Sequence, residues 1–201
     1  MALDEIFATQ FIRIEHDERL QVGPMGNTRW TGHVSGVIAK LGACLGLHAV
    51  TKGTTDQWGR SEYLTIDAML FDSGHRTHSS PQGAAGPFPQ RADEFALPAI
   101  TIEIENLPGK VGYDYWKLLC VRSKLRVLIF VVQEDAEEQP FVDALGGLRA
   151  EHSSLDGEDL LLVGRFEMAL KEPNGTGGWS AHVWRGGSFS RLPCAPSPTC
   201  P

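Results

Sequence analysis

The sequence lacks both a long apolar run and an excess of basic residues. No stretch approaches the roughly 20 apolar residues that a membrane-spanning helix requires. The first residues, MALDEIFATQ, carry acids where a signal peptide would carry Lys or Arg. Because 25 acidic residues outnumber 18 basic ones, the formal net charge is -7, and no global positive field indicates nucleic acid. These absences predict a cytoplasmic protein in which any phosphate-binding surface is local.

Cysteine is also scarce, and the four cysteines match no structural zinc pattern. Cys44 and Cys120 lie in apolar, helix-like segments, which predicts small buried side chains. Cys194 and Cys200 lie in the proline-rich stretch PCAPSPTCP. A reducing compartment is therefore the simpler expectation. The seven histidines are scattered, so no set of nitrogen and sulfur ligands is visible.

The apolar content, in contrast, is ordinary. With 201 residues, 42% hydrophobic and 21% charged, the chain has enough apolar material for one core. The expected parts are an N-terminal arm over residues 1–28, a domain over residues 29–185 and a Pro-rich C-terminal tail over residues 186–201. The Trp residues at positions 30, 58, 116, 179 and 184 form no stacking array and are expected in the core or at its rim.

Hydrophobic periodicity predicts an α/β fold, with a mixed central sheet flanked by helices. The expected helices cover residues 29–50, 108–124 and 140–154, and the expected strands cover residues 61–72, 98–106, 125–132 and 159–170, followed by an edge strand or an irregular segment over residues 178–186. In the second helix, Trp116, Leu119 and Cys120 are expected to share one face. The acidic stretch EDAEE (134–138) is expected to be a solvated loop. Residues 73–94 have no periodicity and are rich in Gly and Pro, which indicates a long functional loop.

Acidic residues on two of these strands suggest a cation site. In ITIEIE (100–105) the isoleucines alternate with Thr101, Glu103 and Glu105, so the two glutamates share one face of a strand. Asp67 is expected in the middle of the preceding strand, on the face opposite Ile66. If the strands are neighbours, the three carboxylates can converge, and such hard oxygen ligands suit Mg²⁺, Mn²⁺ or Ca²⁺. The other interpretation of the two glutamates, the solvated face of an edge strand, stays open.

This order of elements resembles the PD-(D/E)XK superfamily of restriction-endonuclease-like nucleases. In that family an Asp on one strand precedes a strand that ends in Glu-x-Lys, which a helix and a buried strand follow. The resemblance runs from Trp30 to Trp184 and matches Asp67 to the metal-binding Asp and Glu103 to the Glu of the second half-motif. Glu105 stands where Lys is usual, and Lys117 on the following helix is the candidate for a relocated catalytic lysine.

The resemblance implies a nuclease that hydrolyses DNA phosphodiester bonds with Mg²⁺ or Mn²⁺. Asp67, Glu103 and Glu105 would hold the metal, and Glu105 would position the attacking water. The alternative is a catalytically inactive protein that keeps the fold as a binding or assembly module. A homodimer is left open, and so is the choice between DNA and RNA.

Local charge identifies the residues expected to bind nucleic acid. Between Leu107 and Arg126 the sequence carries three lysines and two arginines against Asp114, which leaves a local excess of positive charge. The alternative is a solvated helix face. The residues expected to contact the nucleic acid are His75, Arg76 and Arg91 in the long loop, together with Lys110 and Lys124.

Overall fold

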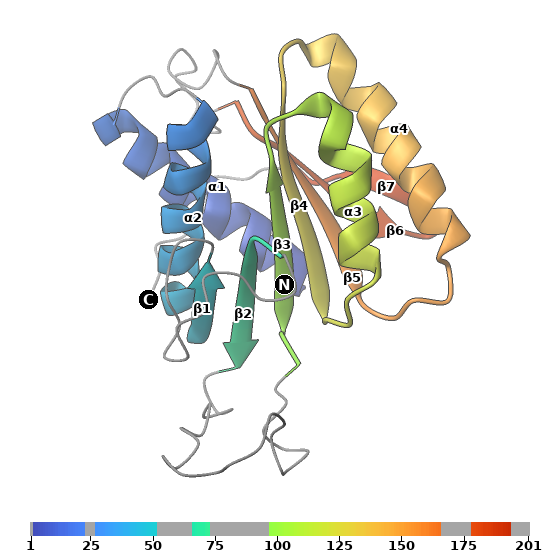
Figure 1. The fold of residues 1–201 in the computed structure, drawn as a ribbon, viewed down its shortest axis with the longest axis horizontal. Helices are drawn as coiled ribbons and strands as arrows, with labels where there is room; N and C mark the ends of the chain where they lie inside the picture. Colours follow the sequence, from blue (N-terminus) through green and yellow to red (C-terminus); the bar gives the residue numbers. More distant parts are fainter. Residues whose placement is uncertain (1, 23–26, 52–65, 73–96, 166–177, 194–201) are drawn as a thin grey trace, which may run out of the picture.

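Seven strands form one continuous sheet in the part of the chain that the structure describes (Figure 1). The computed structural model describes residues 2–22, 27–51, 66–72, 97–165 and 178–193. In chain order the strands are β1 Leu47–Thr51, β2 Ala68–Asp72, β3 Ile100–Glu105, β4 Leu125–Val132, β5 Glu158–Arg165, β6 Ser180–Arg185 and β7 Ser188–Arg191. They lie side by side in this same order, so each strand pairs with its neighbours in the sequence.

The centre of the sheet is parallel and its two flanks are antiparallel. β3, β4 and β5 run in one direction, whereas β1, β2, β6 and β7 pair antiparallel with their neighbours. Parallel neighbours require crossover connections. These are α3 (Val111–Leu119) between β3 and β4, and α4 (Asp135–Glu151) between β4 and β5. Right-handed crossovers that advance in one direction place both helices on the same face of the sheet.

Each face of the sheet buries its own apolar core. α1 (Leu3–Val22) and α2 (Asn27–Cys44) cover one face, and α3 and α4 cover the other. In Figure 1, α3 and α4 lie in front of the sheet and α1 lies behind it. Every residue of β4 is buried, with Val127 and Ile129 in the first core and Leu128 and Phe130 in the second. The predicted α/β class is confirmed, and no helix in the described ranges is long and apolar enough to cross a membrane.

The N-terminal residues, for which the sequence predicted no definite element, form a helix. α1 is a core helix in which Phe7 and Phe11 are fully buried. Its apolar pattern is interrupted by Glu15 and Arg19, which are themselves buried as an ion pair. Charged residues at core positions hide the helical periodicity. At the other end, β7 lies within the predicted tail, while residues 194–201 lie outside the described part of the chain.

The acidic stretch 134–138 is the beginning of α4, so the prediction of a solvated loop was wrong. Glu134 is the N-cap, and its side chain and that of Glu137 form a capping box. Glu138 is buried, with one carboxylate oxygen 2.7 Å from Ser180 Oγ and 2.6 Å from His182 Nε2. Acidic residues in a first turn also favour the helix dipole. The charge run therefore marks a helix start.

The predicted apolar face of α3 was also wrong. Leu119 is buried as expected, but Trp116 is 45% exposed and Cys120 is exposed, while Cys44 is partly buried. The buried aromatic residue is Tyr115, whose hydroxyl donates to Asp159 at 3.2 Å. The hydrogen bond from Tyr115 to the buried Asp159 thus orients α3 so that Tyr115, and not Trp116, faces the core.

Candidate active site

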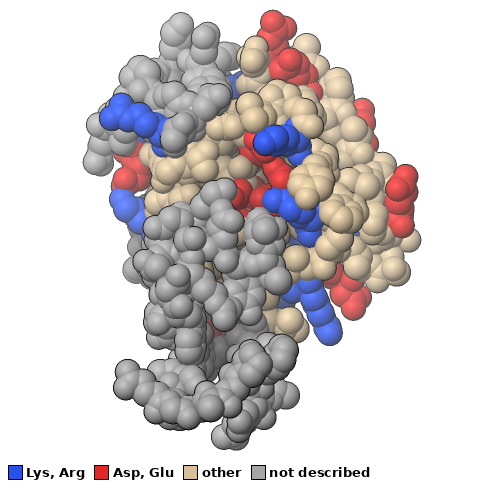
Figure 2. All heavy atoms as spheres, in the orientation of Figure 1, with Lys and Arg blue, Asp and Glu red and all other residues tan. Residues whose placement is uncertain are grey.

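Side chains from β2, β3 and α3 meet on the face of the sheet that α3 covers. Ala68 pairs with Ile102 in the antiparallel register of β2 and β3, which brings Asp67, the residue before β2, beside Glu103. Asp114 and Lys117 project from α3 toward the same place. We call Asp67, Glu103, Glu105 and Asp114 the carboxylate cluster. Figure 2 shows acidic atoms open to view in the middle of this face, with basic atoms beside them.

Glu103 is the most deeply buried member of the carboxylate cluster. The residue is 1% exposed, and its Oε1 lies 2.8 Å from Lys117 Nζ. Burial, above all, raises the pKa of Glu103 from 4.5 to about 9; the Lys117 ammonium opposes this shift, and the Asp67 carboxyl adds to it. At neutral pH, Glu103 therefore holds a proton when no further cation is nearby.

Asp67 lies at a bend and not in the middle of a strand, as had been predicted. Its Oδ2 accepts a hydrogen bond from the Ile104 N–H at 3.0 Å, so a side chain takes the place of a strand carbonyl. The bend breaks the alternation: Ala68 packs in the core beside α1 and α2, but Ile66 packs in the core beside α3. Asp67 also lies on the α3 side, next to Glu103, so the expectation that Asp67 and Ile66 lie on opposite faces was wrong.

Glu105 closes the end of β3. Its Oε1 accepts hydrogen bonds from the N–H groups of Asn106 at 2.8 Å and Leu107 at 2.7 Å, so Asn106 contributes to the turn through its main chain. Burial and a hydrogen bond with Asp114 raise the pKa of Glu105, and the two N–H groups oppose the shift. Glu105 and Asp114 therefore form a second carboxyl pair beside the pair of Asp67 and Glu103.

Lys117 lies between the two carboxyl pairs. Its Nζ is 2.8 Å from Glu103 Oε1 and 2.9 Å from Asp114 Oδ1. Burial acts to lower the pKa of Lys117, but its hydrogen bonds to Glu103 and Asp114 outweigh burial, so the pKa rises above 10.5. Lys117 is therefore an ammonium at neutral pH. The structure brings together Asp67, Glu103 and the proposed relocated lysine.

Two of the three predicted metal ligands, Asp67 and Glu103, lie next to each other. Among the residues described, no three His, Cys, Asp or Glu side chains are grouped so that they could hold a metal ion. Glu105, the third predicted ligand, bonds to the main chain in this arrangement. Mg²⁺, however, is commonly held by one or two carboxylates together with water and substrate phosphates. Asp67 and Glu103 lie together as a pair of this kind, and burial is the largest cause of the raised pKa of Glu103.

Two of the residues predicted to bind nucleic acid, Lys110 and Lys124, are described by the structure, and they lie at opposite ends of β3. Lys110 is exposed at the start of α3, near the end of β3, whereas Lys124 precedes β4 at the end where β3 begins. Lys124 Nζ lies 3.2 Å from Asp72 Oδ2. Arg126 is 2% exposed and pairs with Asp159, so its expected place in a surface patch was wrong. His75, Arg76 and Arg91, and the loop 73–94 that carries them, lie outside the described residues.

Sequence reasoning missed Asp114 as a member of the site. Asp114 lies three residues before Lys117 on α3, which places the two side chains on one face of the helix. That spacing was visible in the sequence. The orientation of this face toward Glu103 was not, because it follows from which α3 residues are buried.

Comparison with protein-family models, with curated proteins and with solved structures gave no match. The function must therefore be argued from the geometry of the site.

Proposed function

We propose that this chain is a metal-dependent nuclease that hydrolyses DNA phosphodiester bonds at the carboxylate cluster. The observation that carries the proposal is the buried Glu103, in contact with the Lys117 ammonium at 2.8 Å and beside the Asp67 carboxyl. Strand, helix and buried strand follow in the order that the resemblance implies, since β2, β3, α3 and β4 succeed one another. The order of the elements and the contact between Lys117 and Glu103 both support the proposal.

A buried carboxyl pair costs stability unless a cation compensates it. Lys117 supplies one positive charge against the four carboxyl groups of the cluster. Such a surplus of carboxyl groups, partly protonated in the absence of a cation, is suited to a divalent ion. Asp67 and Glu103 would hold Mg²⁺ or Mn²⁺, which supplies a Lewis acid for phosphodiester hydrolysis when bound.

The protein groups then have separate roles. Lys117, protonated at neutral pH, would donate hydrogen bonds to a non-bridging phosphate oxygen and stabilise its negative charge. It would not act as a general base, because its raised pKa keeps the proton on Nζ. Asp114 would hold the Lys117 side chain in place from one turn earlier on α3. Glu105 would fix the turn that follows β3.

The test is cleavage of supercoiled and linear DNA in Mg²⁺ or Mn²⁺. We expect cleavage by the wild type and a loss of about 10²-fold or more in Glu103→Gln and Lys117→Ala, in line with the removal of a transition-state donor or metal ligand. Lys40→Ala is the matched control, because it removes the same charge from an exposed side chain that pairs with Glu18 on the opposite face of the sheet. Equal cleavage by Lys117→Ala and the control would contradict the role of Lys117.

A second candidate function is a non-catalytic binding or assembly module. The observation that favours it is Glu105, whose carboxylate bonds to the main chain and not to a common point with Asp67 and Glu103. A wild-type protein that cuts neither DNA nor RNA in Mg²⁺ or Mn²⁺, while it remains folded, would favour the module over the nuclease.

A further inference from the structure

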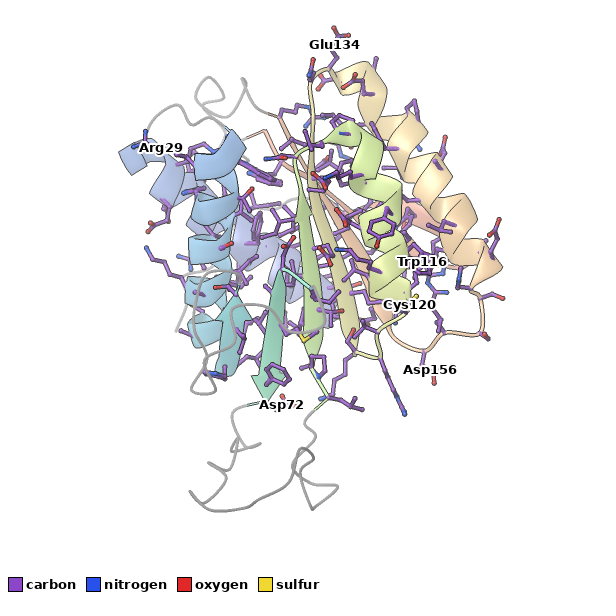
Figure 3. All side chains as sticks on the ribbon, viewed as in Figure 1. Arg29, Asp72, Trp116, Cys120, Glu134 and Asp156 are labelled. Carbon is purple, nitrogen blue, oxygen red and sulfur yellow. The ribbon has the colours of Figure 1, made fainter. Side chains whose placement is uncertain are left out.

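The outer face of α3 carries two exposed aromatic side chains. Tyr113 is 62% exposed and Trp116 is 45% exposed, although large apolar residues are usually buried. Their ring centroids are 5.9 Å apart with an interplanar angle of 30°, so the rings stack on each other. Figure 3 labels Trp116 on α3, the helix that lies in front of the sheet in this view. We call these two residues the aromatic platform.

The aromatic platform adjoins the carboxylate cluster through one side chain. Lys117 Nζ lies 5.7 Å from the centroid of the Tyr113 ring and 2.8 Å from Glu103 Oε1. The exposed Lys110 and Tyr113 and the partly buried Lys117 follow one another at spacings of three and four residues, which places them along one side of the helix. Aromatic rings and ammonium groups therefore alternate along a stripe that ends at the proposed catalytic centre.

We propose that the aromatic platform stacks an unpaired nucleobase of a strand whose backbone phosphate lies at the carboxylate cluster. This inference rests on the nuclease proposed above and specifies its substrate as a single strand, or a duplex with an unpaired end. Base stacking on exposed aromatic side chains, combined with cations that contact phosphates, is the usual means of binding single strands. Paired bases within a duplex do not expose a face for such stacking.

The neighbouring charges favour a nucleic acid over an apolar protein partner. Lys110, at the beginning of the stripe, is exposed, and Lys117 Nζ lies over the Tyr113 ring, 5.7 Å from its centroid. In a nucleic acid strand each base is attached next to a phosphate, which matches the arrangement of the Tyr113 ring next to the Lys117 ammonium. Apolar protein interfaces, in contrast, are depleted in lysine at their centre.

The experiment measures binding without cleavage. The full chain is used with the substitutions Asp67→Asn and Glu103→Gln, and the buffer contains EDTA. The two substitutions remove the proposed metal ligands and part of the negative charge of the carboxylate cluster. Fluorescence anisotropy then compares a labelled oligothymidine, the same strand with abasic sites and a blunt duplex. We expect Tyr113→Ala with Trp116→Ala to weaken binding of the oligothymidine at least about fivefold, the lower end of stacking contributions, and to leave the abasic strand and the duplex unchanged.

Two variants control for loss of an apolar surface alone. Leu97→Ala truncates another exposed apolar side chain, which is 61% exposed and precedes β3, and should leave binding unchanged. Trp116→Phe keeps an aromatic ring at this position and should retain most of the affinity that the Ala variants lose. Urea unfolding of each variant checks that the exposed substitutions leave the fold intact.

The binding experiment tests the aromatic platform independently of nuclease activity. A platform-dependent preference for the base-bearing strand supports the platform even if the wild type cleaves nothing, in which case only the nuclease fails. Equal binding of base-bearing and abasic strands would overturn the platform. So would the absence of binding to any strand, or an effect of the Ala variants on self-association alone, which would mark this face as a protein interface.

Discussion

Glu103 is the most informative residue of the site, because its surroundings disfavour the ionised carboxylate. It is buried beside a second acid, Asp67, and Lys117 compensates only part of the penalty. For a structural role, glutamine would serve equally well at this position and would need no counter-charge. The carboxyl group at this position is therefore the feature on which the proposed metal site depends.

The raised pKa of Glu103 predicts a particular dependence of stability on pH. Between pH 4.5 and 9, folded Glu103 keeps a proton that the unfolded chain releases, so the free energy of unfolding falls as pH rises, by at most about 1.4 kcal/mol per pH unit. The raised pKa of Lys117 contributes no slope here, since both states are protonated below pH 10.5. We expect Glu103→Gln to match the wild type near pH 5 and to exceed its stability near pH 8.5.

Urea unfolding at several pH values measures this effect in the absence of divalent ions. Asp143→Asn is a suitable control, because Asp143 is an exposed acid on α4 that accepts a hydrogen bond from Gln139. Parallel stability curves for the wild type and Glu103→Gln would show that Glu103 ionises at its ordinary pKa and would contradict the proposed environment.

The sequence was informative about those side chains whose spacing alone sets their direction. The isoleucines of β3 lie in one core and Glu103 faces the other side, as their alternation predicted. The prediction put Asp67 inside a strand, whereas it lies at a bend. The hydrogen bond from the Ile104 N–H to the Asp67 side chain cannot be recognised from hydrophobic periodicity. Asp114 and the exposed Trp116 were missed because both depend on the rotation of α3 about its axis.

The elements around the site are joined by a second set of buried charges. Asp159 on β5 is fully buried and accepts hydrogen bonds from Arg126 of β4 at 2.8 and 2.9 Å and from Arg149 of α4 at 2.7 Å. Tyr115 of α3 donates to the same carboxylate at 3.2 Å. One carboxylate thus connects two strands and the two helices that cover them, and it fixes the face that α3 presents to β3.

Asp159→Asn should therefore destabilise the protein strongly. It leaves two buried guanidinium groups without their counter-charge, for which the expected loss in the free energy of unfolding is about 3–5 kcal/mol. Asp156→Ala is the control, because Asp156 is exposed and contacts Arg126 only through its main-chain carbonyl among the hydrogen bonds observed. Chemical denaturation of both variants provides the measurement. A loss for Asp159→Asn no larger than that for the control would contradict the connecting role of Asp159.

Predicting the elements succeeded where a segment is buried on both sides and failed at the edges. The strands β3, β4 and β5 were expected from apolar or alternating runs. β1 was instead included in the preceding helix, although Gly46, with φ of 67°, ends α2 just before it. α1 was missed because the ion pair of Glu15 and Arg19 occupies positions that apolar residues would otherwise mark.

For the whole molecule, the sheet places the site at the boundary between its antiparallel and parallel parts. β3 pairs antiparallel with β2, which brings Asp67, and its parallel crossover to β4 brings α3 with Lys117. Ligands in open α/β sheets often bind where strand direction or order changes, because the connections diverge there. Metal binding at this boundary would hold together β2 and β3 and should be visible as global stabilisation.

The last prediction links such stabilisation to the proton on Glu103. An ion that binds the folded chain alone, at 100 times its dissociation constant, adds about 2.7 kcal/mol to the free energy of unfolding, or about 5–10 °C in the melting temperature of a domain of this size. Because the ion must displace the Glu103 proton, we expect the shift produced by Ca²⁺ or Mn²⁺ to be larger at pH 8.5 than at pH 6.

Thermal unfolding at constant ionic strength provides the measurement, with the wild type, Asp67→Asn, Glu103→Gln and the exposed control Asp143→Asn. Non-specific screening of the net negative charge would raise the melting temperature of all four proteins alike, and with little dependence on pH in this range. Binding at the carboxylate pair should instead be reduced in the two site variants and retained in the control. An equal shift in Glu103→Gln and the wild type would show that the ion binds elsewhere, and the proposed metal site would then be abandoned even if the protein cleaves DNA.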